Sequence, residues 1–210
     1  MLRNLLDKKR IWELLNSNEA DSLFIDPLLD ASQIGAVTVN LRLGYAFFLS
    51  ILTRKPSIET SINPDNQHHR AIGSYFQETR RDLGEKFVLY PHQVVLCTTL
   101  EYVSLPPNIY ADILSRSSYT RLGIPLNTMV QPGFRGCIPL ELFNHGNSPV
   151  ELVVGSRVCQ ARFFEIEQNV GYIDGAKQRK YFGQVRPTVS SADTDSEMSK
   201  LVKIAELPKF

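Results

Sequence analysis

Apolar and polar residues alternate over short stretches through most of the chain between residues 36 and 166. In the first of these stretches, Val37, Val39, Leu41 and Leu43 alternate with polar side chains, which predicts a strand with two distinct faces. Six further strands are predicted, each bounded by Pro, Gly, Asn or Ser turn signals: Phe87–Tyr90, Val94–Leu100, Ile109–Leu114, Gly136–Asn144, Val150–Val154 and Arg157–Ile166. Many short strands at this spacing indicate a mainly β fold, as a sandwich, jelly roll or barrel.

The clearest helical signal lies in the N-terminal region, and no long helical period follows residue 20. Asp7 is placed to cap a short helix whose apolar stripe consists of Leu6, Ile11, Leu14 and Leu15. Residues 53–85 are polar with a weak apolar pattern, so we expect a peripheral excursion that carries helical structure. We expect residues 1–189 to form one domain and residues 190–210 to form a mobile tail.

Composition narrows the class of protein. The 210 residues are 43% hydrophobic and 21% charged, and the net charge of +1 gives no global field toward nucleic acid or an anionic membrane. No apolar run approaches a membrane span, and the N-terminus lacks the pattern of a secretory signal. The three isolated cysteines, Cys97, Cys137 and Cys159, are expected to be buried free thiols, which favours a cytoplasmic protein.

One short segment concentrates groups that bind anions. Arg116, Ser117, Ser118 and Arg121 place two guanidinium groups and two hydroxyls within six residues. Such groups match phosphate oxygens well, although the same residues would also suit a solvated turn. No Gly-rich Walker pattern is present, so the motif alone indicates no particular nucleotide site.

A single carboxylate follows in an apolar strand. Glu141 shares one face of the strand at 136–144 with Pro139 and Phe143, while the other face is wholly apolar. Because both faces are largely apolar, we expect the strand to be covered on both sides and Glu141 to lie in a partly dry place. Glu141 would then be either a functional acid or the structural partner of an arginine. Pro139 predicts an edge or interrupted strand, since it cannot donate to a ladder.

Zinc chemistry is disfavoured by the motifs. Zinc-dependent nucleobase deaminases carry an H-x-E motif with a later P-C-x-x-C, and this chain has neither. The G-x-S-x-G elbow of serine hydrolases is also missing. We therefore expect no zinc site.

The order of these motifs resembles the dCTP deaminase family, whose members are relatives of the trimeric dUTPases. The resemblance rests on Arg116-Ser-Ser-x-x-Arg-Leu-Gly123, Pro132-Gly-Phe-x-Gly136, Leu140-Glu141 and Asn144. It extends to Gly35–Gly44, Thr99–Pro106 and Gly155–Phe164, and to the tail segment Lys180-Tyr-Phe-Gly-Gln184. The family implies a β-rich, dUTPase-like distorted barrel or jelly roll, a homotrimer with active sites between subunits, and Mg²⁺ bound through the triphosphate.

The resemblance also implies a metal-free hydrolysis of dCTP to dUTP and ammonia, feeding dUMP and dTTP synthesis. Glu141 would be the general acid and base, Ser117 and Arg121 would orient water and polarise the base, and Arg116 and Ser118 would bind phosphates. The other expected contacts with dCTP or dUTP are Gln131, Pro139, Leu140, Tyr172, Lys180 and Gln184, with the tail residues excluding water.

This chain departs from the family pattern between Gly123 and Pro132. The segment Ile124–Gln131 is a few residues shorter than the family's loop, and Gln131 and Ser115 replace an aspartate and a glycine. In dUTPases the corresponding aspartate activates water, so Gln131 argues against dUTPase-type pyrophosphate cleavage. A dUTPase-like or bifunctional enzyme and a non-catalytic nucleotide-binding relative remain the alternatives.

Overall fold

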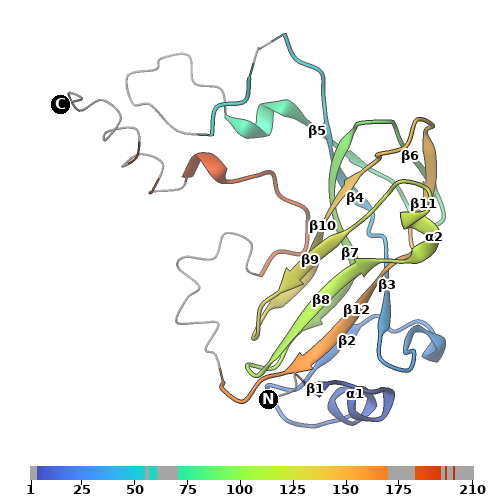
Figure 1. Cartoon of the computed structure of the whole chain (residues 1–210), viewed down its shortest axis with the longest axis vertical. Helices are drawn as coiled ribbons and strands as arrows, with labels where there is room; N and C mark the ends of the chain where they lie inside the picture. The colour runs from blue at the N-terminus through green and yellow to red at the C-terminus, as the bar shows by residue number, and fades with distance from the viewer. Residues whose placement is uncertain are drawn as a thin grey trace.

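Two five-stranded antiparallel sheets form the frame of the protein. A computed structural model describes residues 4–54, 57–60, 71–169, 183–194, 197 and 201. The β8 sheet has the order β1-β12-β8-β9, with β3 also paired to β12, and the β7 sheet has the order β10-β7-β4-β5, with β2 also paired to β7 (Figure 1). Their strands are β1 (Asn4–Leu5), β2 (Phe24–Asp26), β3 (Val39–Arg42), β4 (Ala46–Ser50), β5 (Phe76–Arg80), β7 (Val94–Ser104), β8 (Ile109–Ser115), β9 (Asn127–Val130), β10 (Arg135–Phe143) and β12 (Arg157–Glu165).

Shorter elements surround these sheets. A two-stranded sheet pairs β6 (Lys86–Leu89) with β11 (Val150–Val153). The helices are α1 (Lys8–Leu15) and α2 (Ser117–Thr120), and the 3-10 helices are η1 (Ala31–Gln33), η2 (Ile72–Tyr75) and η4 (Ala192–Thr194). None of the helices in the described part of the chain is long and apolar enough to span a membrane.

The predicted alternation determines which side chains form the core. Val39, Leu41 and Leu43 are fully buried, and Ile109, Ala111 and Ile113 of β8 face the same core. On β10 the row Ile138, Leu140 and Leu142 is buried, while Pro139, Glu141 and Phe143 are not. The mainly β class and all seven predicted strands are confirmed.

The N-terminal helix is also confirmed. The Asp7 carboxylate accepts a hydrogen bond from the Arg10 amide at 2.8 Å, which caps the first turn of α1 and contributes about 0.5–2 kcal/mol. Ile11 is the fully buried side chain of α1, and Trp12, Leu14 and Leu15 of the same helix pack against the core. Local sequence therefore determines this helix and the face that it buries.

Five of the described strands were not predicted: β1, β2, β4, β5 and β9. Within the polar excursion, Phe76–Arg80 form β5, an outer strand that pairs with β4 and is mostly exposed, so its sequence lacks alternation. The described part of the excursion thus contains an edge strand as well as the expected helical structure, which is the 3-10 helix η2 at Ile72–Tyr75. In the shortened segment, Asn127–Val130 form β9 along β8, and Ile124 and Leu126 are buried.

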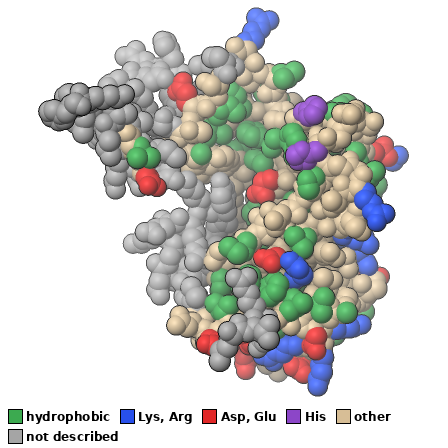
Figure 2. Space-filling model, viewed as in Figure 1, with side chains coloured by type: hydrophobic (Ala, Val, Ile, Leu, Met, Phe, Trp, Pro, Cys, Tyr) green, Lys and Arg blue, Asp and Glu red, His purple; other side chains and the backbone are tan. Residues whose placement is uncertain are grey.

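The charges on the surface are mixed. In the face shown in Figure 2, Lys and Arg side chains lie mainly along the lower and right margins, interrupted by Asp and Glu. The middle of this face is largely uncharged. This distribution agrees with the small net charge and offers no broad basic surface on the described part of this face.

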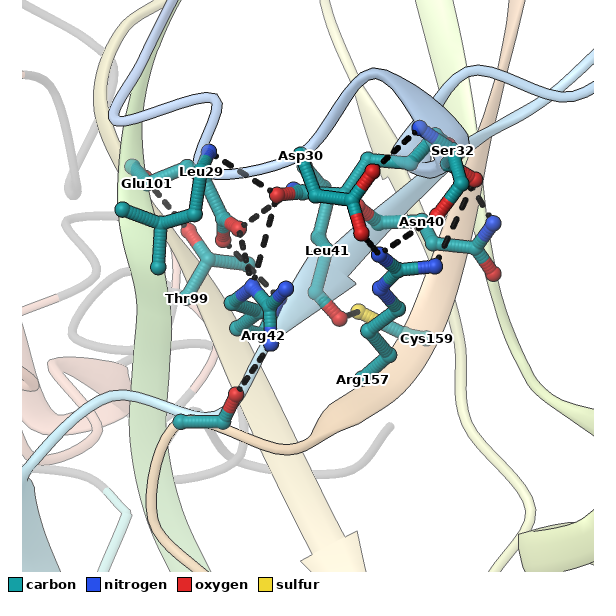
Figure 3. A network of polar contacts seen from close by, with 12 residues as sticks. Leu29, Asp30, Ser32, Asn40, Leu41, Arg42, Thr99, Glu101, Arg157 and Cys159 are labelled. Atoms are coloured by element: carbon teal, nitrogen blue, oxygen red, sulfur yellow. Dashed lines mark hydrogen bonds and ion pairs between the residues drawn. The ribbon is translucent and has the colours of Figure 1, made fainter. Parts of the chain in front are cut away.

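A buried polar network joins the N-terminal segment to both sheets (Figure 3). Glu101 lies in the inward row of β7 and is 0% exposed. Its carboxylate accepts hydrogen bonds from the Arg42 amide at 2.8 Å and from the Gln33 side-chain amide at 3.1 Å. Arg42 continues the network by donating to the Gly155 carbonyl at 2.8 Å.

Burial raises the pKa of Glu101, and the hydrogen bonds from Arg42 and Gln33 only partly oppose that shift. A carboxyl whose pKa is higher in the folded than in the unfolded state holds its proton longer when folded. Its contribution to stability is complete below the unfolded pKa and is lost as the pH rises through the folded pKa.

The Glu101→Gln variant should be less stable than wild type by about 1–3 kcal/mol at low pH. Its new side-chain NH2 group would face the N–H group of Arg42 or Gln33, and two donors cannot form a hydrogen bond. The difference should shrink as the pH rises from about 4.5 toward neutrality, since only the wild type loses stability there. Denaturant unfolding of both proteins at several pH values measures this. A difference that stays constant with pH would show that Glu101 does not titrate in this range.

Candidate active site

The predicted anion-binding residues lie where β8 ends. Ser115 is the last residue of β8, and its hydroxyl accepts a hydrogen bond from the Leu126 amide at 3.2 Å and pairs with the Thr120 hydroxyl at 2.7 Å. The chain then turns into α2, which leaves Ser117 and Ser118 exposed to solvent. Ser115, which replaces the expected glycine, thus fastens the start of the shortened segment to α2.

Three hydrogen bonds hold α2 against the start of β12 and the turn that precedes it. Arg116 donates its guanidinium N–H to the Arg157 carbonyl at 3.3 Å, and its backbone amide donates to Val158 at 3.0 Å. Tyr119 shares a hydrogen bond with the Ser156 hydroxyl at 3.2 Å. Because Gly155 of the same turn accepts from Arg42, the turn is in contact with both the buried network and α2.

Arg121 lines an open cavity of about 610 Å³ beside the turn at 145–151. Asn144 organises that turn from a fully buried position, since its side chain donates to the Leu89 and Ser148 carbonyls and accepts from the Gly146 amide. Gly123 is required at the contact, because a Cβ there would lie 2.7 Å from the Gly146 nitrogen. The motif residues Gly123 and Asn144 therefore shape the surroundings of Arg121.

Glu141 lies on β10, the outer strand of the β7 sheet, and lines a second cavity of about 210 Å³. The prediction of a partly dry place is wrong for the single chain, in which Glu141 is exposed. The apolar neighbours that suggested coverage, Pro139 and Phe143, are themselves only half-buried on this outer face. Glu141 forms no ion pair with an arginine among the described residues, so no contact there assigns it a structural role.

The strand that carries Pro139, β10, is irregular as well as outermost in its sheet. Pairing between β10 and β7 shifts register between Cys137 and Pro139. At the shift, the Ile138 amide donates to the Thr99 hydroxyl at 2.9 Å instead of to a backbone carbonyl. The expectation that Pro139 marks an edge or interrupted strand is confirmed on both counts.

The cysteines of the region are inert. All three are buried free thiols, as predicted. Burial raises the pKa of Cys97, which lines the Glu141 cavity, far above its usual range, and the nearby charges of Cys159 and Glu141 act in the same direction. A thiol that keeps its proton is a poor nucleophile, so Cys97 is not a candidate for the chemistry of this cavity.

The remaining predicted site residues do not all lie at one cavity. Pro139 and Leu140 line the Glu141 cavity, although the Leu140 side chain is buried in the core. Gln131 is exposed in the turn before β10. Gln184 is half-buried, and its carbonyl accepts from the Cys137 amide at 2.9 Å. Tyr172 and Lys180 lie outside the described residues.

Within one chain the predicted site falls into two parts. Arg121 lines one cavity and Glu141 lines the other, and neither cavity includes residues of the other group. Thr188 and Ser190 also line the Glu141 cavity, although neither was predicted as a site residue. The signal in the sequence was the Pro187-Thr pair, which follows the tail motif and belongs to the same family resemblance. No group of three potential metal-ligating side chains occurs among the described residues.

Comparisons with known proteins agree with the motifs. The family model described as dCTP deaminase-like matches residues 5–166. A "dCTP deaminase, dUMP-forming" from Methanobrevibacter smithii is 35% identical over 93% of this chain and 99% of its own length. A "dCTP deaminase" from Halorubrum lacusprofundi is 35% identical over 88% of this chain and 91% of its own.

A solved structure supports the fold. The 2'-deoxycytidine 5'-triphosphate deaminase from Agrobacterium tumefaciens superimposes with a TM-score of 0.58 at 23% identity. The superposition covers 79% of this chain but only 47% of that longer chain. With the family match across residues 5–166, these comparisons show that the chain belongs to the dCTP deaminase-like family.

Proposed function

We propose that this protein hydrolyses the amino group of dCTP and releases ammonia. The observation that carries the proposal is the exposed carboxylate of Glu141, which lines a cavity of about 210 Å³ on an irregular edge strand. The position of Glu141 in the motif order is that of the family's acid and base, and the relatives that match most of the chain are named dCTP deaminases.

The chemistry needs one group that both takes and returns a proton. Water adds its oxygen to C4 of the cytosine ring while Glu141 takes one proton from it and delivers that proton to ring nitrogen N3. Glu141 then takes the proton of the new C4 hydroxyl and gives it to the amino nitrogen as the C4–N4 bond breaks, so that the C4 carbonyl forms and ammonia and a uracil ring result. In this proposal Ser117 and Arg121 orient the water and polarise the base, while Arg116 and Ser118 bind the phosphates.

The separation of the two groups supports a site formed between copies of the chain. Arg121 and the exposed Ser117 and Ser118 extend from α2, whereas Glu141 faces a different cavity on the β7 sheet. We propose a homotrimer in which α2 of one copy faces Glu141 of the next. Closed rotational symmetry would repeat this heterologous contact three times and complete three sites.

Magnesium enters the proposal with the nucleotide. The described residues contain no cluster that would hold a metal, whereas Arg116 and Ser118 suit phosphate oxygens. We propose that Mg²⁺ is bound through the triphosphate, where it neutralises charge. Three buried thiols favour a cytoplasmic setting, where the product would feed dUMP and dTTP synthesis.

The product is the point on which two candidates differ. Several relatives are named dUMP-forming, which favours a second activity that releases pyrophosphate from the deaminated nucleotide. Gln131 favours the simpler product dUTP, because an amide cannot take a proton from water as a carboxylate does. Incubation with dCTP and Mg²⁺, followed by separation of dUTP, dUMP and pyrophosphate, distinguishes them. Binding without ammonia release would identify a non-catalytic relative.

The Glu141→Gln variant should bind dCTP but release ammonia about 10²- to 10⁴-fold more slowly, because an amide cannot shuttle the proton. Ammonia release and calorimetric binding measure the two effects separately. Glu13→Gln is the matched control, since it removes an exposed carboxylate of α1. Full activity of Glu141→Gln would contradict the proposed mechanism.

Mixing two inactive variants tests the shared site. Glu141→Gln and Arg121→Ala should each be nearly inactive, but subunits unfolded together, mixed equally and refolded should recover about a quarter of wild-type activity. That fraction follows because one interface in four would join an intact Glu141 to an intact Arg121. Recovery of no activity, in a mixture that has the wild-type oligomeric mass, would place both residues of a site in one chain.

A further inference from the structure

The described segment 183–194 runs along the outer edge of β10 (Figure 1). The Gly183 amide donates to the Arg135 carbonyl and the Cys137 amide donates to the Gln184 carbonyl, both at 2.9 Å. These two hydrogen bonds satisfy backbone groups on an edge of β10 that no described strand covers. The segment is thus docked on the strand that carries Glu141.

Gly136 makes this docking possible. It lies between the two hydrogen-bonded residues of β10 and has a φ of 146°, which side chains other than hydrogen rarely allow. A Cβ at this position would lie 2.6 Å from the Gln184 carbonyl oxygen. The glycine therefore serves the contact with the tail as well as the local backbone.

Beyond Gln184 the segment continues across the Glu141 cavity. Pro187 is buried, and the Val189 side chain comes within 3.7 Å of the place that a Cβ of Gly73 would take. Between and after these anchors, Thr188 and Ser190 line the cavity together with Glu141. The side chains of the other lining residues are apolar or contain sulfur: Leu96, Cys97, Pro139 and Leu140.

We propose that Thr188 and Ser190 are positioning residues of the acid–base site, presented by a tail segment that docks at Gly136. This inference deepens the proposed function and rests on it. The cavity is large enough for ordered water, and besides Glu141 the hydroxyls of Thr188 and Ser190 are the strong hydrogen-bonding side-chain groups among its described lining residues, since the Cys97 thiol already donates to the Leu140 carbonyl. They hold the attacking water, and later the departing ammonia, in line with the Glu141 carboxylate.

The kinetic test removes the hydroxyls with little change of shape. The double variant Thr188→Val/Ser190→Ala should lower kcat for ammonia release by about 10- to 100-fold and leave KM for dCTP within about threefold. Thr188→Ser should retain activity, because it keeps the hydroxyl. Ser191→Ala is the control, since Ser191 does not line the cavity. A double variant with kcat within twofold of wild type would overturn the positioning role.

The docking test does not depend on turnover. In the wild type, hydrogen exchange should be slow at the Gly183 and Cys137 amides, and Gly136→Ala should accelerate both by at least about tenfold. Gly84→Ala is the control, because Gly84 also has a positive φ of 85° but no atom within 4 Å of its Cβ position. Fast exchange at both amides in the wild type would overturn the docked tail. A wild type that releases no ammonia would instead contradict the proposed function.

Discussion

A carboxylate with no exposed surface holds the frame of this protein together. Glu101 occupies the inward row of β7, where an ionised group is costly unless donors surround it. Gln33 supplies one donor and the Arg42 amide another, so the N-terminal segment and β3 are both tied to β7. Gln33 itself also accepts from the Leu29 amide and donates to the Asn40 carbonyl, which leaves its buried amide satisfied. β3 can therefore pair with β12 of one sheet and still meet the other sheet at the bridge between Leu43 and Thr99.

The same network reaches the functional surface through one turn. Arg42 holds Gly155 from within, and Arg157 is bound to Asp30 and Ser32 of the N-terminal segment at 3.1 and 2.9 Å. Arg116 donates to the Arg157 carbonyl at the start of β12, and the Tyr119 and Ser156 hydroxyls share a hydrogen bond. The orientation of α2, and with it the proposed phosphate contacts, thus depends on interactions that begin in the core.

Local patterns were sufficient for much of this account. The cap at Asp7, the alternation in β3 and the apolar inward row of β10 are properties of neighbouring residues, and the structure follows them. β5 was missed because an outer strand with an exposed face needs no alternation, and β9 because its segment was read as a loop of unusual length. Glu101 also gives no local signal, since its donors come from residues up to 68 positions away.

The candidate site divides in the same way. Motif order was enough to select Arg121 and Glu141, but not to foresee that they line different cavities of one chain. The exposure of Glu141 was mispredicted because Pro139 and Phe143 are apolar residues of an open face rather than of a core. Thr188 and Ser190 reach Glu141 only through docking of the tail near Gly136, a contact between segments far apart in sequence.

The most direct test of this account is a crystal structure of the Glu141→Gln variant with dCTP and Mg²⁺. The account predicts that the triphosphate lies on Arg116 and Ser118 of one copy, while C4 of the cytosine ring faces residue 141 of a neighbouring copy across a trapped water. A nucleotide held entirely within one chain, or a cytosine ring directed away from residue 141, would contradict it.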